Sequence, residues 1–499
     1  MTKKCVIIGS GLGGLSSGVI LAKNGYDVTV LEKHFQIGGC LQCFCRDGVK
    51  FETGMHFIGS ADKGQTMDAM FKYLEIDHDV KLSRLDEMGY DVVSLAGKRY
   101  RFANGRYNFI KQMLEYFPDS EDDLNAYCDI IDKVSAASSL HSLQHTQTDE
   151  AINNEYLLRS IDDVLNETIH NDELRNVLVG NLPLYAAEKG KTSFSTHAFV
   201  ADFYNKSAFR IVGGSDLIAK SLAHTIERYG GKVITRQNIV KIECDDSHAV
   251  AVVTDDATRY DADVFISDLH PARTIELTDS SLLRNAYRKR IKTLSNTVGC
   301  FTVYIKFKDK AQHYMNSNFY GYAGKSPWDC EKYSDNDWPK GYLYMHFCDT
   351  ANHEYAKSGL IISYMQYDDV AKWEGTSVGH RGQDYEQFKK LKAEKLIASV
   401  EKEFPGLRDS IQSYYTSTPL TYRDYTGTEA GGMYGIARDI TLGPAARVHH
   451  RTKIPNLLLT GQNVNSHGIL GVLVGTVVTC GELISSEEII RQMTESTKI

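Results

Sequence analysis

The 499-residue sequence lacks the features that mark several classes of protein. It contains no block of Lys and Arg, and its 56 basic and 64 acidic residues give a net charge of −8, which argues against nucleic acid as a partner. Only four apolar residues stand between the basic start and Gly9, so no secretory signal is predicted. The longest weakly polar run, residues 468–481, falls short of the roughly 20 apolar residues of a spanning helix. We therefore expect no transmembrane segment.

The ten cysteines are scattered along the chain. Without an export signal, this pattern predicts reduced thiols and a cytoplasmic protein. Cys40, Cys43 and Cys45 lie close together, but a metal site needs further ligands and no second CxxC pair is present, so no metal is expected. The length favours two or three domains, and a composition of 42% hydrophobic and 24% charged residues is ordinary for a folded protein.

The N-terminal segment has the pattern of a βαβ unit. Residues 5–8 are an apolar run typical of a buried strand, residues 15–23 repeat apolar residues at helical spacing, and residues 27–31 predict a second strand. Asn24 and Gly25 are expected to end the helix. This is the opening of a doubly wound α/β sheet.

A glycine-rich turn joins the first strand to the helix. Gly9 permits the tight bend, Gly11 lets the backbone approach a pyrophosphate, and Gly14 lets the helix pack closely on the strand. Glu32, at the end of the second strand, is placed to accept hydrogen bonds from ribose hydroxyls. A glycine-rich turn without a ligand is the alternative, but the strand, turn, helix and acidic residue together favour dinucleotide binding.

Two later features favour FAD over NAD as the tightly held cofactor. Gly38 and Gly39 follow Glu32 closely, and residues 460–463 precede a second glycine-punctuated helix that opens at residues 468–471. The N-terminus of this helix is expected to face the flavin, where its partial positive charge would favour the anionic reduced form. A simple NAD domain does not need these parts.

The dinucleotide-binding domain is predicted to be discontinuous. Ser215 is expected to cap a helix that ends at residues 230–231. Strands are then expected at residues 232–235, 239–242, 249–254, 262–267 and 454–460. Residues 76–205 favour helices, whereas an alternation typical of a separate sheet occurs at residues 298–307, 342–348 and 360–367.

These patterns predict an α/β fold with a glutathione reductase-like FAD domain and an inserted α+β substrate domain. The FAD domain is expected to comprise residues 1–75, 206–275 and 426–499. The substrate domain is expected to comprise residues 76–205 and 276–425.

The phosphate loop, the GG turn and the C-terminal Thr-Gly-Gln segment resemble those of the flavin amine oxidase and phytoene desaturase superfamily over nearly the whole chain. Residues 51–59 (FETGMHFIG) resemble the FDTGxHYIG segment of its retinol saturase branch, and residues 418–421 and 432–435 are similar to that branch too. Carotenoid isomerases and desaturases usually lack this histidine. The resemblance implies an FAD-dependent oxidoreductase that acts on CH–CH groups of a retinoid- or carotenoid-like isoprenoid.

The same resemblance implies the roles of several site residues. Gly461, Gln462 and Asn463 would contact the flavin phosphates, and Ile239 would supply a backbone contact to adenine. Asn463 departs from the usual aspartate, although both side chains accept a hydrogen bond from a hydroxyl. The candidate cofactor-binding residues are Gly9, Gly11, Leu12, Gly13, Gly14, Glu32, Lys33, Gly38, Gly39, Ile239, Gly461, Gln462, Asn463, Gly468, Ile469 and Gly471.

In such enzymes a hydride passes between flavin N5 and a substrate carbon, and this chemistry belongs to the cofactor. Reduction of a double bond also needs a proton, for which His56, with a reference pKa near ~6.5, is the first candidate donor. Tyr434 is the second candidate. The alternative for His56 is a buried histidine that only hydrogen-bonds a loop, and His467 could contact the flavin or cap its turn.

Three functions stay open: a redox enzyme that saturates or desaturates a polyene, a flavin-dependent isomerase without net redox change, and a non-catalytic lipid carrier such as the Rab GDP-dissociation inhibitors of the same superfamily. The intact phosphate loop and Glu32 favour an enzyme. NAD(P)H stays open as an external electron donor, since no separate NAD(P)-binding loop is evident. An apolar substrate also predicts peripheral contact with a membrane. The oligomeric state is not indicated.

Overall fold

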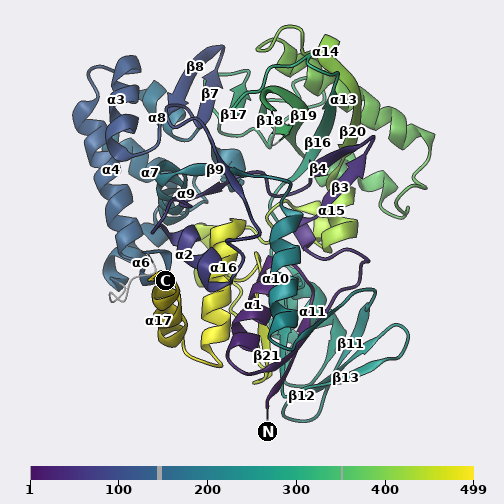
Figure 1. Ribbon diagram of the computed structural model, residues 1–499. Helices are drawn as coiled ribbons and strands as arrows, with labels where there is room; N and C mark the ends of the chain where they lie inside the picture. The colour runs from purple at the N-terminus through teal and green to yellow at the C-terminus, as the bar shows by residue number, and fades with distance from the viewer. Residues whose placement is uncertain (1, 143–148, 350–351, 499) are drawn as a thin grey trace.

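A five-stranded parallel sheet forms the lower part of the molecule in Figure 1, in a computed structural model that describes residues 2–142, 149–349 and 352–498. The strand order is β10-β2-β1-β14-β21, and every neighbouring pair is parallel. The strands are β1 (Lys4–Ile8), β2 (Asp27–Leu31), β10 (Lys232–Ile234), β14 (Val264–Ser267) and β21 (Leu457–Leu459). The predicted doubly wound α/β fold is confirmed.

Three helices pack together beside this sheet: α1 (Leu12–Lys23), α10 (Asp216–Arg228) and α16 (Gly468–Gly481). The segment from Gly13 to Ala22 of α1 is buried throughout, which explains its lack of a polar face. Gly18 allows the close approach of α10, because a Cβ there would lie 2.7 Å from Cδ1 of Ile226. The expected helix and its end at Asn24 are confirmed.

The helix predicted after Ser215 is present, but Ser215 does not cap it as expected. Its backbone is already helical, and its hydroxyl makes no capping bond. The hydroxyl donates instead to the carbonyl oxygen of Leu41, 3.2 Å away. The side chain thereby ties the start of α10 to the turn that follows the GG pair, here a short 3₁₀ helix, η1 (Gly39–Leu41).

A small four-stranded sheet lies next to the parallel sheet (Figure 1). Its order is β13-β12-β11-β15, formed by β11 (Ile239–Cys244), β12 (Ala249–Thr254), β13 (Arg259–Asp261) and β15 (Thr278–Asp279). Helix α11 (Pro271–Leu277) directly precedes β15, and helix α12 (Asn285–Lys292) follows that strand. The strands expected at 239–242 and 249–254 are confirmed, and they pair antiparallel with each other.

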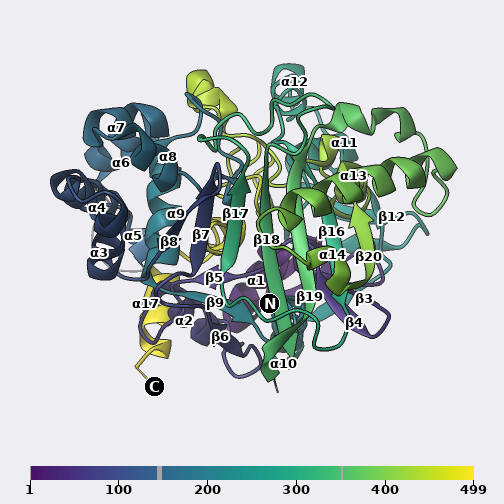
Figure 2. The same ribbon diagram turned by 90° about the horizontal axis from the view of Figure 1, so that it is seen from above.

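A seven-stranded sheet occupies the other half of the molecule (Figure 2). Its order is β20-β16-β19-β18-β17-β7-β8. The strands are β7 (Asp91–Leu95), β8 (Lys98–Phe102), β16 (Gly299–Phe307), β17 (Asn318–Tyr322), β18 (Gly341–Asp349), β19 (Asn352–Met365) and β20 (Ile411–Ser417). The three strands expected in this region are confirmed, whereas β7 and β8 come from a segment predicted to be helical.

Helices flank the seven-stranded sheet on two sides (Figure 2). One group comprises α3 (Arg106–Tyr116), α4 (Glu121–Ala136), α5 (Ser139–Ser142), α6 (Glu150–Leu158), α7 (Ile161–Thr168), α8 (Asp172–Leu178) and α9 (Phe194–Lys206). The other comprises α13 (Gln383–Glu401), α14 (Leu407–Ser410) and α15 (Pro419–Thr426). Ser160 caps α7 by accepting a hydrogen bond from the backbone N–H of Asp163, and α7 is one of the helices expected within residues 76–205.

Short elements join the two halves of the molecule. The hairpin of β3 (Cys43–Arg46) and β4 (Val49–Glu52) leads to a three-stranded sheet of β5 (Ile58–Gly59), β6 (Leu82–Arg84) and β9 (Ala208–Ile211). The C-terminal α17 (Ser486–Ser496) packs against α2 (Thr66–Tyr73). Within the described residues, no helix has the length and apolar character needed to cross a bilayer.

Candidate functional site

One cavity of about 390 Å³ extends from the carboxyl ends of β1 and β2 to the seven-stranded sheet. Ligands of open α/β sheets bind at this edge, outside the carboxyl ends of the strands. One part of its lining comes from the phosphate loop and from residues 31–34, and another comes from β17, β18 and β19. The cavity therefore has one end suited to a dinucleotide and another enclosed by the sheet.

The glycine-rich turn forms a cradle that side chains would fill. Gly9 has φ +97°, a backbone conformation that favours glycine. A Cβ on Gly14 would overlap the carbonyl oxygen of Gly9, and a Cβ on Gly13 would lie 2.7 Å from the backbone nitrogen of Gly461. The loop and the Gly461 segment thus meet backbone to backbone, which fits the close approach of a pyrophosphate.

Glu32 lies buried at the edge of the cavity, with 7% of its surface exposed. One carboxylate oxygen accepts hydrogen bonds from the hydroxyl and the N–H of Ser10, at 2.6 and 3.1 Å, and the other accepts from the N–H of His34 at 2.8 Å. Each carboxylate oxygen can accept more than one hydrogen bond, so capacity is left for a ribose hydroxyl. The protein thereby fixes the carboxylate before a ligand arrives.

Asp268 is a residue of this cradle that the sequence reasoning missed. It follows β14 directly, and its carboxyl oxygens lie where a Cβ on Gly11 or Gly461 would be. Burial raises the pKa of Asp268 to about 7, although hydrogen bonds from the backbone of Gly14 and Gly11 act in the opposite direction. Its position at the carboxyl end of a predicted strand was the available signal.

The structure gathers the other predicted cofactor residues around the same cavity. Asn463 is buried, and its amide oxygen accepts a hydrogen bond from the N–H of Ile436 at 2.9 Å, so that oxygen holds a neighbouring loop. Gly14 and Gly471 are absent from the lining; a Cβ on Gly471 would lie 2.6 Å from that of Ser466. The predicted residues in the lining are Gly9, Gly11, Leu12, Gly13, Glu32, Lys33, Gly38, Gly39, Ile239, Gly461, Gln462, Asn463, Gly468 and Ile469.

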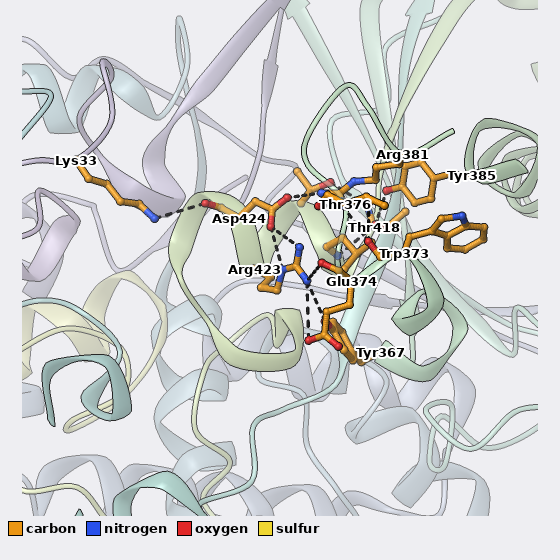
Figure 3. A network of polar contacts seen from close by, with 12 residues as sticks. Lys33, Tyr367, Trp373, Glu374, Thr376, Arg381, Tyr385, Thr418, Arg423 and Asp424 are labelled. Carbon is orange, nitrogen blue, oxygen red and sulfur yellow. Dashed lines mark hydrogen bonds and ion pairs between the residues drawn. The ribbon is translucent and has the colours of Figure 1, made fainter. Parts of the chain in front are cut away.

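A polar network holds the helix α15 (Figure 3), and part of this helix lines the cavity. The guanidinium of Arg381, with 5% of the side chain exposed, forms an ion pair with Asp424 and donates to the carbonyl oxygen of Thr376 at 2.9 Å. Arg423 donates to the other oxygen of Asp424, and Lys33 donates to the backbone carbonyl of Asp424. The network therefore connects residue 33, beside the candidate ribose site, with α15.

We expect that Arg381→Gln destabilises the protein by about 2 kcal/mol, because a hydrogen bond to a charged group contributes about 1.5–3 kcal/mol and Asp424 keeps its bonds to Arg423. Arg408→Gln is the matched control, since Arg408 is exposed and its ion pairs with Glu394 and Glu401 are worth little. Urea unfolding measures both variants. Equal unfolding free energies in the two would contradict a stabilising role for the buried pair.

His56 lines the cavity on the segment between β4 and β5. Burial lowers the pKa of His56 to about 3, and the charge of Arg210 acts in the same direction. The imidazole is therefore neutral at neutral pH, which differs from the titrating histidine that its reference pKa suggested. Tyr434 also lines the cavity, but its hydroxyl donates to the carbonyl oxygen of Pro183 at 3.0 Å.

His467 does not cap α16 with its side chain. Its Nδ1 lies 2.6 Å from Nη1 of Arg438, which must donate because a guanidinium has no acceptor. Burial lowers the pKa of His467 well below its usual range, so this ring too is neutral.

The seven-stranded sheet adds aromatic residues to the cavity. Tyr322, Tyr342 and Tyr364 line it, whereas Tyr304 and Tyr344, which share their strand setting, do not. The hydroxyls of Tyr342 and Tyr364 are buried and have no hydrogen-bond partner. The sequence could not separate the lining tyrosines from those of the core, because both kinds alternate along strands.

Comparisons with known proteins agree with this geometry. The family model for flavin-containing amine oxidoreductases matches residues 12–469. Human all-trans-retinol 13,14-reductase is 26% identical, over 96% of this chain and 85% of its own length. Prolycopene isomerase 1 of an Oncidium hybrid cultivar is 23% identical, over 97% of this chain and 84% of its own length.

Solved structures show the same fold. An oxidoreductase from Methanosarcina mazei has a TM-score of 0.64 at 17% identity, covering 95% of this chain and 99% of its own. A putrescine oxidase has a TM-score of 0.62 at 16% identity, covering 98% of this chain and 99% of its own. The chain is therefore an FAD-dependent oxidoreductase that belongs to the family of flavin-containing amine oxidoreductases, in the branch of the retinol reductases and prolycopene isomerases.

Proposed function

We propose that the protein saturates a carbon–carbon double bond of an apolar polyene or other isoprenoid. The observation that carries the proposal is the cavity itself, which joins a dinucleotide cradle to an end enclosed by tyrosines and aliphatic side chains. Bound FAD supplies hydride transfer at its N5 atom. The names of the similar retinol reductases, which act on a polyene alcohol, support the substrate class.

In this proposal the chain's own residues hold the cofactor, exclude water and deliver a proton. The glycine cradle and Glu32 bind the dinucleotide, and the sheet tyrosines enclose the substrate. His56 is the proposed proton donor, because it is the histidine of the matched segment and lies in the lining. Tyr434 is the less suitable donor, since its hydroxyl is already bonded to Pro183.

Isomerisation without net redox change is the second candidate, favoured by the similarity to prolycopene isomerases. Turnover in deuterated water separates the two functions. Saturation places at least one solvent deuterium on carbon and raises the product mass by two hydrogens in ordinary water, whereas isomerisation leaves the mass in ordinary water unchanged. A product of unchanged mass but altered geometry would replace our first candidate by the second.

A second cavity supports the proposal that the protein contacts a membrane. It shares Leu184, Tyr204 and Asn463 with the first cavity, so it borders the same site. Leu158 of α6 lines it and is 62% exposed. Leu442, in the neighbouring 3₁₀ segment η6 (Ile440–Ala446), is 55% exposed. Exposed apolar side chains beside a cavity are what an enzyme needs to take its substrate from a bilayer.

We expect that the double variant Leu158→Asp/Leu442→Asp loses most of its binding to anionic lipid vesicles, while its FAD content is unchanged. The loss of buried apolar area and the added negative charge both act against binding. Leu391→Asp is the control, because Leu391 is equally exposed, at 58%, on α13. Vesicle sedimentation measures the effect, and equal binding by all three proteins would contradict this contact surface.

A further inference from the structure

Two buried polar atoms without partners face each other beside the cavity. Oε2 of Glu52, the last residue of β4, lies 3.7 Å from Nδ1 of His56. The side chains are 7% and 10% exposed, and neither atom has a hydrogen-bond partner. Buried polar atoms are nearly always hydrogen-bonded, so a donor–acceptor pair left just beyond bonding distance calls for a functional explanation.

Neighbouring groups hold the carboxyl of Glu52 and the backbone of His56. A hydrogen bond from the backbone of Ser215 reaches the carboxyl of Glu52. The carbonyl oxygen of His56 accepts a hydrogen bond from Nη1 of Arg210 at 3.3 Å. With Nδ1 enclosed against Glu52, Nε2 is the ring nitrogen left for the cavity that His56 lines. The imidazole therefore stands between the carboxyl group and the cavity.

Both groups are neutral at neutral pH. Burial raises the pKa of Glu52 to about 8, although Arg210 acts in the opposite direction. Burial lowers the pKa of His56 to about 3. A neutral imidazole is a weak acid by itself, because loss of its only N–H proton would leave an imidazolate. It becomes an effective donor when a second group supplies a proton to its other nitrogen.

The other titratable groups around Glu52 lie on β4 itself and on β9, α10 and β3. Arg210 of β9 is the cation that lowers the pKa of Glu52 most. Lys50 of β4 lowers it less and forms an ion pair with Asp216 of α10 at 2.9 Å. Burial raises the pKa of the Cys43 thiol to about 12, so this group of β3 stays neutral. The carboxyl of Glu52 is thus the group of this cluster whose proton can leave near neutral pH.

We propose that Glu52 is the proton source behind His56 in the double-bond reduction proposed above, on which this inference rests. As the Nε2–H proton passes to the substrate carbon, the carboxyl proton of Glu52 passes to Nδ1. The substrate carbon gains a C–H bond, and its partner carbon has received the hydride of the reduced flavin. Glu52 is left as a carboxylate and His56 as the opposite neutral tautomer. Between turnovers Nε2 takes up a proton from water and Nδ1 returns its proton to the carboxylate of Glu52, which restores both groups.

The test uses the pre-reduced holoenzyme mixed with a polyene. We expect Glu52→Gln to slow saturation by about 100-fold or more, the typical contribution of a proton-transfer group, with FAD content unchanged. The wild-type rate is expected to fall as the pH rises through the Glu52 pKa of about 8, because the protonated form is required. This alkaline decline should vanish in Glu52→Gln and persist, at a reduced rate, in Glu52→Asp.

Asp91→Asn is the matched control. Asp91 is a fully buried carboxyl that also interacts with Arg210, but it is bonded to Asn318 and has no contact with His56. Its removal should leave the pH profile of turnover unchanged. A Glu52→Gln enzyme that keeps the wild-type rate and its alkaline decline would overturn the proposal.

A second readout does not depend on activity. Nitrogen-15 NMR of the histidine side chains, with the His56 signal identified by its loss in His56→Gln, should show a neutral ring protonated at Nε2. A cationic ring, or a neutral ring protonated at Nδ1, would overturn the relay even where Glu52→Gln fails to fold. A wild-type enzyme that reduces no polyene would contradict the proposed function instead, whatever the NMR shows.

Discussion

Replacing Gly11 with valine is expected to yield a folded protein that purifies without yellow colour. A Cβ at this position would overlap the carboxyl of Asp268 and occupy the cradle next to the pyrophosphate site. Overpacking costs about 1–3 kcal/mol, and each lost hydrogen bond to a charged phosphate costs about 1.5–3 kcal/mol. The affinity for FAD should therefore fall by at least about 100-fold.

The FAD content per protein, read from absorbance after purification, measures this effect. Titration of the apoprotein with FAD then gives the dissociation constant. Gly324→Ala is the control, because a Cβ there meets no atom within 4 Å. Full FAD content in the Gly11→Val protein would contradict the placement of the cofactor, and so would a colourless wild-type protein that binds only NAD.

The second large effect is expected for His56→Gln. If His56 donates the proton, the variant should keep FAD and substrate while turnover slows by about 100- to 10,000-fold, the range for a lost general acid. Reduction of the flavin by an external donor should be largely spared, because it does not involve this proton. Stopped-flow measurement of the two half-reactions separates these steps.

Tyr434→Phe distinguishes the two candidate donors. A large loss in this variant, together with normal turnover in His56→Gln, would transfer the role to Tyr434. Loss of FAD or of the folded state in His56→Gln would instead make His56 structural. The structure favours His56, because the Tyr434 hydroxyl is held by Pro183 and would have to break that bond to donate.

The FAD-binding part of the fold was predictable because its signals are local. The strand, the glycine turn and the helix up to Asn24 follow one another in the sequence, and the structure reproduces them within three residues. The strands β7 and β8 were missed, since two short strands set among helices join a sheet whose other members lie some 200 residues further on. Their pairing with β17 is a long-range property that no local pattern carries.

In the candidate site, too, the residues of local motifs could be predicted, whereas those that depend on spatial neighbours could not. Motif spacing located Glu32 and the glycines, and the structure places nearly all of them around one cavity. Asp268 and Glu52 were missed as functional candidates, because their importance comes from burial and from what faces them in space. The low pKa of His56 has the same origin, since burial and the charge of Arg210 act across segments distant in sequence.

Anaerobic mixing of the photoreduced yellow protein with a polyene tests the central claim most directly. Photoreduction removes the need to know the natural electron donor, so only the proposed reaction is observed. The account predicts that the absorbance of the oxidised flavin returns at the same rate as a product with two more hydrogens appears. One product molecule should form for each flavin that is reoxidised. A flavin that stays reduced while every retinoid and carotenoid tested is recovered unchanged would contradict it.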